Sequence, residues 1–253
     1  MTNTPTSAPA PRAWFFPLII IALAISTYLM SDMISPALPQ LCHDFAITSR
    51  AAKHIIGLYL LGMILPQLIL GPLSDAFGRK PIIMSGLLIA MIGSLLGVMA
   101  HSISVLNIAR LLQGIGAGAI SLNARAMGRD LYSGKQLVKL SAYIGTTIGV
   151  APALAPLLGG YLQHTFHWQA IFIFTLSWLA TLLVIILTVL PETNTHRHDT
   201  PFSLHAMQRH YHRLLHTPSF VMNTLYAAIS FAIIMVYFTV SPHLLQIDYH
   251  LSV

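Results

Sequence analysis

Charged residues are scarce in this 253-residue sequence: they make up only 8% of it, whereas hydrophobic residues make up 55%. A soluble domain carries roughly 25% charged residues, so water cannot be the main solvent of this chain. Cysteine is almost absent, since Cys42 stands alone, which excludes an internal disulfide framework and a cysteine-based zinc site. The 13 Lys and Arg residues lie between apolar runs rather than on one soluble face, which argues against binding to nucleic acid.

Long apolar runs are what the sequence has in abundance. A helix needs about 20 apolar residues to cross the hydrocarbon core of a bilayer. Seven runs approach this length, at about 14–33, 54–73, 81–100, 104–124, 140–161, 168–190 and 219–242. They predict an all-α integral membrane protein with a tail over 1–13, a six-helix bundle over 14–190, a histidine-rich loop over 191–218 and a seventh helix within 219–253.

The first run has an alternative interpretation, because a polar start and Arg12 precede it as they would in a signal peptide. The run is too long for the apolar part of such a peptide and no Ala-x-Ala site follows it, so we predict a retained helix. With a cytoplasmic N-terminus, ten Lys and Arg fall in cytoplasmic segments and only Arg50 and Lys53 fall outside. The positive-inside rule therefore predicts that the N-terminal tail and the histidine-rich loop are cytoplasmic.

The turn after the second run reads Gly71-Pro72-Leu73-Ser74-Asp75-Ala76-Phe77-Gly78-Arg79-Lys80. It resembles the signature between the second and third helices of the major facilitator superfamily, where this loop latches one half of the protein to the other. Asp75 can lie against a helix N-terminus, while Arg79 and Lys80 can face the headgroups. The simpler alternative is an ordinary basic turn, and Ala76 replaces the arginine that is usual in the signature.

Arg110 lies inside the fourth run, where a central arginine costs about 2.5 to 3.5 kcal/mol on insertion scales. The segment 106–118 resembles the fourth-helix motif of the superfamily, and Gln113 shares the helical face of Arg110. We expect Arg110 to donate to polar groups of the first helix, with Asp32 as its electrostatic partner within about 8 Å. Alternatively, Arg110 snorkels to the membrane surface.

Asp32 is the only acidic residue of the first six runs. The segment 31–39 resembles the first-helix motif of the Bcr/CflA family, which is named for bicyclomycin and chloramphenicol resistance. A carboxyl group in a low dielectric can exchange a proton near neutral pH or attract a cationic substrate. The alternative is an ordinary exposed carboxylate at the end of the helix.

The fifth run carries small and kinking residues at helical spacing: Gly145, Gly149, Pro152, Pro156 and Gly160. They share one face, which allows a neighbouring backbone to approach closely and can bend the helix. The segment 151–160 resembles the motif shared by antiporters of the superfamily, although plain helix packing explains it too. Residues 124–134, 168–172 and 190–193 fit the same family, with Gln169 in place of the usual arginine.

The resemblance implies two three-helix repeats in one six-helix bundle, followed over 219–253 by a seventh helix and the start of an incomplete C-terminal half. It implies a secondary transporter of the cell membrane, which is the inner membrane if the protein is bacterial. This transporter would export small amphipathic compounds or drugs in exchange for protons, with Asp32, Arg110 and Gln113 in its site. The expected partners are substrate, protons, lipid and a second half, and no cofactor is expected. One alternative is a truncated or split module that does not transport; another is an intramembrane enzyme, for which the runs lack a catalytic constellation.

Histidines crowd the loop between the sixth and seventh runs, at positions 196, 198, 205, 210, 212 and 216. Imidazoles at this density can bind zinc or nickel. Their spacing matches no fixed metal site, and an amphipathic segment over about 202–215 that lies in the membrane interface explains the loop without a metal. We therefore predict no metal site.

Overall fold

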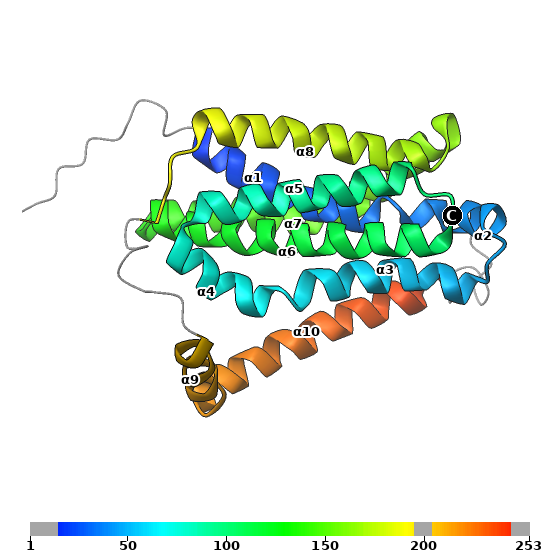
Figure 1. Ribbon diagram of the computed structural model, residues 1–253. Coiled ribbons are helices and arrows are strands. Elements are labelled where there is room, and N and C mark those ends of the chain that lie inside the picture. The colour runs from blue at the N-terminus through cyan, green and yellow to red at the C-terminus, as the bar shows by residue number, and fades with distance from the viewer. Residues whose placement is uncertain (1–14, 195–203, 244–253) are drawn as a thin grey trace, which may run out of the picture. The chain divides into compact units, whose positions relative to one another are not determined.

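A computed structural model describes residues 15–194 and 204–243, and all regular elements within these two stretches are helices (Figure 1). In chain order they are α1 Phe15–Asp32, the 3-10 helix η1 Ser35–Ala37, α2 Leu38–Asp44, α3 Ser49–Ile64, α4 Gln67–Phe77, α5 Arg79–Val98, α6 Ile103–Leu131, α7 Gly134–Phe166, α8 Gln169–Val189, α9 Leu204–Leu215 and α10 Pro218–His243. The predicted all-α class is confirmed.

The chain divides into two compact units, residues 1–201 and 202–253. Within the described residues six helical segments are long and apolar enough to cross a membrane: Phe15–Asp44, Ser49–Phe77, Arg79–Val98, Ile103–Leu131, Gly134–Phe166 and Gln169–Val189. Each contains most of one of the first six predicted runs. In the second unit α10 covers the seventh run, and its passage through the membrane stays a prediction. The predicted tail 1–13, residues 195–203 of the loop and residues 244–253 lie outside the described residues.

Helix α6 is the centre of the first unit, since it packs against α1, α3 and α5, while α5 also packs against α8 and α1 against α7 (Figure 1). Glycine makes this packing possible. A Cβ atom at Gly114 would collide with the carbonyl oxygen of Tyr59, and one at Gly62 would collide with that of Leu111. The backbones of α3 and α6 are therefore in direct contact, which is typical of small residues at membrane helix crossings.

Two of the spans are broken rather than straight. The second span divides at Leu65 and Pro66, where α3 ends and α4 begins, because proline lacks the amide hydrogen that continues a helix. The first span passes from α1 through the short helix η1 into α2, which ends at Asp44. Helices α6 and α7 extend past the apolar runs, so the bundle projects beyond the hydrophobic part of its sequence.

Candidate functional site

A buried polar cluster, formed by Tyr59, Ser94, Arg110 and Gln113, lies where α1, α3, α5 and α6 meet. Arg110 and Gln113 are each only 1% exposed. Nη1 of Arg110 donates to the carbonyl oxygen of Met30 at 2.6 Å and to Oε1 of Gln113 at 2.7 Å. The expected hydrogen bond to the first helix is thus present and ends on a backbone carbonyl, and Arg110 does not snorkel.

The other members of the buried polar cluster extend it to two further helices. Nε2 of Gln113 donates to Oγ of Ser94 at 2.8 Å, which ties α6 to α5. The ring of Tyr59 lies 4.5 Å from the guanidinium carbon of Arg110, and its hydroxyl donates to the carbonyl oxygen of Thr27 at 2.7 Å. Nε and Nη2 of Arg110 have no hydrogen-bond partner among the described residues. Arg110 is therefore a buried cation with two nitrogen atoms that donate no hydrogen bond to the described residues.

Asp32 is the last residue of α1 and is partly exposed. It lies close enough to Arg110 for the two charges to interact. No direct ion pair joins them in the part of the chain that the structure describes. Asp32 as the electrostatic partner of Arg110 at about 8 Å stays a prediction.

A small cleft opens between α1, α6 and α7, one helical turn before Asp32. Its lining combines polar and apolar side chains: Ala24, Thr27, Tyr28, Ser121, Ala124, Arg125, Ile144 and Ile148. Tyr28 is four residues before Asp32 on α1 and interacts electrostatically with both Asp32 and Arg125. Sequence reasoning missed Tyr28 and counted Arg125 only as a loop charge, because neither residue is unusual in its own helix.

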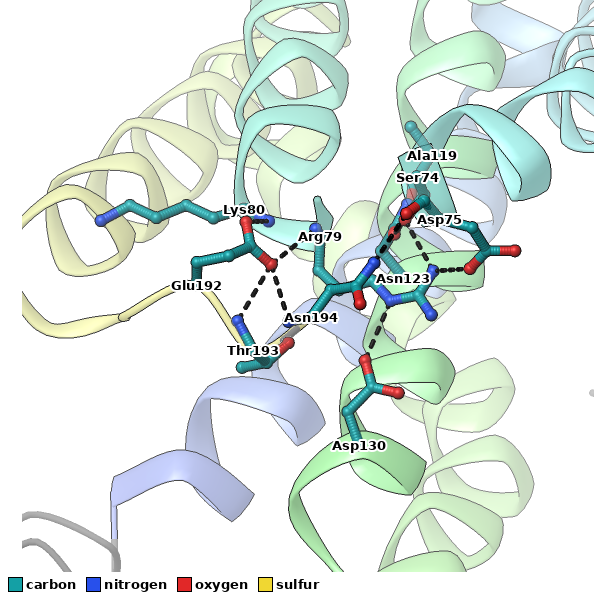
Figure 2. Close-up of polar contacts among 10 residues, drawn as sticks. All are labelled: Ser74, Asp75, Arg79, Lys80, Ala119, Asn123, Asp130, Glu192, Thr193 and Asn194. Atoms are coloured by element: carbon teal, nitrogen blue, oxygen red, sulfur yellow. Dashed lines mark hydrogen bonds and ion pairs between the residues drawn. The ribbon is translucent and has the colours of Figure 1, made fainter. Parts of the chain in front are cut away.

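The predicted latch motif forms a second polar network, at the end of the first unit where α4 turns into α5 (Figure 2). The Arg79 guanidinium donates to Oδ2 of Asp130 at 2.9 Å and to Oδ1 of Asp75 at 2.5 Å. It also donates to the hydroxyl of Ser74, which in turn donates to Oδ1 of Asn123. Arg79 therefore connects α4, α5 and α6 even though Ala76 replaces the usual arginine.

Glu192, which follows α8, caps the N-terminus of α5 (Figure 2). Its carboxylate accepts hydrogen bonds from the amide nitrogens of Arg79 at 2.8 Å and Lys80 at 3.1 Å. Gly78 has a φ of +105° at this turn, and a Cβ atom there would collide with the same carboxylate. The acid at this helix N-terminus is thus Glu192, while Asp75 faces Arg79.

Two further contacts tie the segment after α8 to the latch. Nζ of Lys80 donates to the carbonyl oxygen of Leu190 at 2.6 Å, so Lys80 points along the protein rather than outward. Nδ2 of Asn194 donates to the carbonyl oxygen of Asp75 at 2.8 Å. Gly71 is less tightly packed, since the nearest atom to its Cβ position is Cδ2 of Leu122 at 3.9 Å.

The face predicted for antiporter-type packing is only partly in contact. No atom lies within 4 Å of a Cβ atom built on Gly145 or Gly149, so the backbone contact expected there is not made within the described residues. A Cβ atom built on Gly160 lies 3.8 Å from Cβ of Pro36. Pro152 and Pro156 lie inside α7, which continues through both. The closest approach is made by Gly159, whose Cβ position coincides with the carbonyl group of Met33.

No group of three or more His, Cys, Asp or Glu side chains lies close enough to hold a metal ion within residues 15–194 and 204–243. His196 and His198 of the histidine-rich loop fall outside those residues. That the loop holds no metal stays a prediction.

Comparison with known proteins gives the same family as the motifs. The pattern of the Major Facilitator Superfamily matches residues 20–253. Multidrug resistance protein D of Escherichia coli (strain K12) is 34% identical over 177 residues, which are 70% of this chain and 45% of that protein. The bicyclomycin resistance protein homolog of Haemophilus influenzae is 32% identical over 182 residues, 71% of this chain and 45% of that protein. These relatives confirm the resemblance to the Bcr/CflA family.

Longer matches and solved structures extend this comparison. Multidrug resistance protein MdtM of Salmonella typhimurium is 30% identical over 232 residues, 91% of this chain and 56% of that protein. The chain thus spans about half the length of the curated relatives it matches. A peptide transporter POT in complex with sulfate has the same fold, with a TM-score of 0.64 at 16% identity over 91% of this chain and 52% of that one. The human organic anion transporter MFSD10 has a TM-score of 0.63 at 19% identity, over 78% of this chain and 53% of that one.

Proposed function

The chain belongs to the major facilitator superfamily, and from this premise we propose that it forms the substrate and proton site of an exporter of small amphipathic compounds or drugs. Membership of this family also makes it a multi-pass membrane protein of the transporter type rather than an enzyme, as predicted. The names of its relatives, which refer to multidrug and bicyclomycin resistance, support the choice of substrates. The proposal rests on Asp32, the last residue of α1, which interacts electrostatically with the buried Arg110 and with Tyr28 of the cleft of α1, α6 and α7.

The cleft has a volume of about 10 Å³, the space of one water molecule, so we propose that its side chains form one wall of a larger site that opens for an amphipathic substrate. Thr27, Tyr28 and Ser121 offer hydroxyl groups, while Ile144 and Ile148 offer an apolar wall. A cationic substrate in this cleft is attracted by the Asp32 carboxylate, which lies one turn of α1 further on. Protonation of Asp32 from the outer side removes that attraction, so that proton entry and substrate release are coupled. The fixed positive charge of Arg110 favours the ionised form of Asp32, so that Asp32 releases its proton on the inner side.

The latch network supports an orientation for the bundle. Arg79, Lys80, Arg125 and Arg129 gather at the end where α4 turns into α5 and α6 into α7. We propose that this end faces the cytoplasm, together with the tail 1–13 and the loop 191–218, and that the membrane is the inner membrane if the protein is bacterial. Residues 219–253 then begin a second half, and alternating access arises as two such bundles rock around the site.

Proton release on substrate binding tests the proposal on the chain itself. Binding of the cation tetraphenylphosphonium to the purified chain in weakly buffered detergent should release about one proton per bound cation near neutral pH, because the bound charge favours the Asp32 carboxylate. Asp32→Asn should bind the cation more weakly and release none. Asp44→Asn is the matched control, since the Asp44 carboxylate accepts a hydrogen bond from Nε1 of Trp168 away from the cleft. Equal proton release by Asp32→Asn and the unchanged chain would remove Asp32 from the mechanism.

A further inference from the structure

Helix α9 separates its apolar and cationic residues on two opposite sides. His205, Arg209, His212 and Arg213 of α9, and His216 in the turn directly after it, recur at the spacing of one helical face, and all five are exposed. We call them the cationic face of α9. On the opposite side Met207, Tyr211 and Leu214 are partly buried. An apolar stripe against a basic stripe is the pattern of a helix that lies in a membrane interface rather than across it.

Nothing on this helix or its neighbour neutralises the cationic face. The sequence of α9 contains no Asp or Glu. Helix α10, which packs against α9, contains no Asp, Glu, Lys or Arg, and its titratable residues are only Tyr226, Tyr237 and His243. Within α9 and α10, no acidic side chain therefore offsets the charge of this face.

The charge of the cationic face depends on pH in the physiological range. The two arginines are always charged, whereas histidines gain charge as the pH falls through the range from about 8 to 5. The rings of His212 and His216 lie 4.2 Å apart, so their charges add at one place. Partial burial raises the pKa of the Tyr211 phenol above its ordinary value, which keeps this side chain neutral over the same range. Acidification thus adds up to three positive charges to the cationic face and one more to α9 at His210, and removes none.

We propose that α9 lies on the membrane surface and binds anionic phospholipid headgroups through its cationic face, more strongly as the pH falls. Lipid is the partner because of where the helix stands in the chain. Only His216 and Thr217 separate α9 from α10, a helix of 26 residues without an acidic or a Lys or Arg side chain. The face is therefore attached to the end of a long apolar helix, at the depth of the headgroups. A metal ion does not fit, because the arginines of the same face repel it.

A spin label on the apolar side of α9 tests this in the full chain. The chain with Cys42→Ser and labelled Met207→Cys is placed in nanodiscs of phosphatidylcholine alone or with roughly 30% phosphatidylglycerol. Collisions of the label with oxygen report lipid, and collisions with a water-soluble nickel chelate report water. We expect the ratio of oxygen to nickel collisions to rise several-fold with phosphatidylglycerol, and to be larger at about pH 5.5 than at about pH 7.5.

Variants test the preference for anionic lipid and its pH dependence separately. Replacement of His205, His210, His212 and His216 by Gln should abolish the pH dependence but keep the preference for phosphatidylglycerol. Replacement of Arg209 and Arg213 by Gln should weaken that preference at both pH values. His43→Gln with His101→Gln, two exposed histidines of the first unit, is the matched control and should change nothing.

Three results would overturn the proposal. Equal collision ratios in the two lipids would show that α9 packs on protein or on any apolar surface. A pH dependence that survives when all four histidines are replaced would assign it to another group. If inorganic phosphate at constant ionic strength abolishes the preference, the cationic face is a site for a soluble anion.

Discussion

Arg110 is kept inside the bundle by groups of α1 and α3 and by Gln113 of its own helix, α6. Its planar guanidinium donates to a backbone carbonyl of α1 and to Gln113, and it stacks on the Tyr59 ring. A lysine would carry the same charge but not this fork of donors. The position of Arg110 thus depends on acceptors as much as on charge.

Gln113→Leu should destabilise the protein, because leucine has a similar volume but removes an acceptor from a buried cation. We expect a loss of about 1 to 3 kcal/mol, the usual cost of leaving a buried polar group unpaired. Thermal unfolding of the purified protein in detergent measures it. Gln136→Leu is the matched control, since Gln136 is exposed near the start of α7. Equal unfolding temperatures for the two variants would mean that Gln113 does not hold Arg110.

Glu192 has a comparable role at the other network, and its removal should loosen the start of α5. Glu192→Ala should cost about 0.5 to 2 kcal/mol, the range for loss of a helix N-cap. Glu192→Gln should cost less, because the amide oxygen can still accept one hydrogen bond. Hydrogen exchange at the amides of Arg79 and Lys80 should become faster in both variants. The amide of Val105, which Ser102 caps at the start of α6, should not change; faster exchange there as well would indicate general unfolding instead.

Only part of these two networks can be predicted from sequence. Arg110 and Asp32 are visible because a charge in an apolar run is rare and costly. Asp130 and Glu192 are not, since each lies in a polar segment where a carboxylate is ordinary. Their partners lie 51 and 113 residues away in the chain, and only the packing of α5 against α6 and α8 brings them to Arg79.

At the scale of the helices, hydropathy predicts where the spans lie but not how they meet. The break at Pro66 falls within a uniformly apolar run, so hydropathy does not indicate it. Helix α2 follows the end of the first apolar run, so hydropathy does not indicate it either. Glycines are equally ambiguous in the sequence. Gly114 lies in a helix crossing and Gly145 lies against open space, although both occur in small-residue motifs of the family.

These two glycines give a matched pair for the next prediction. Gly114→Ala should destabilise the bundle by about 1 to 3 kcal/mol, because the new methyl group meets the Tyr59 backbone and α3 must move away from α6. Gly145→Ala meets no atom and gains helix propensity, so it should be neutral or stabilising by up to about 1 kcal/mol. Unfolding temperatures in detergent compare them. A larger loss in Gly145→Ala would mean that its open face is covered in the working protein.

At the scale of the whole molecule, the bundle exposes large apolar side chains on α7 and at the junction of α3 and α4. Leu154, Leu157 and Tyr161 of α7 are 58%, 70% and 65% exposed, and Leu65 and Leu68 beside the break of the second span are 60% and 56% exposed. Lipid or a second bundle can cover such surfaces. Without a second bundle, this bundle has no partner against which it can rotate.

We therefore predict that residues 1–253 as a monomer bind substrate but do not export it. Alternating access requires that the cleft of α1, α6 and α7 open first to one side and then to the other, and this needs a second body that closes the opposite side. Efflux of ethidium from vesicles with an imposed pH gradient measures export, and native mass spectrometry establishes the monomer. Co-expression with the second six helices of multidrug resistance protein D should restore efflux, and Asp32→Asn in the same pair should abolish it again. Rapid efflux by the proven monomer would contradict the prediction and would require the cleft to change sides within one bundle.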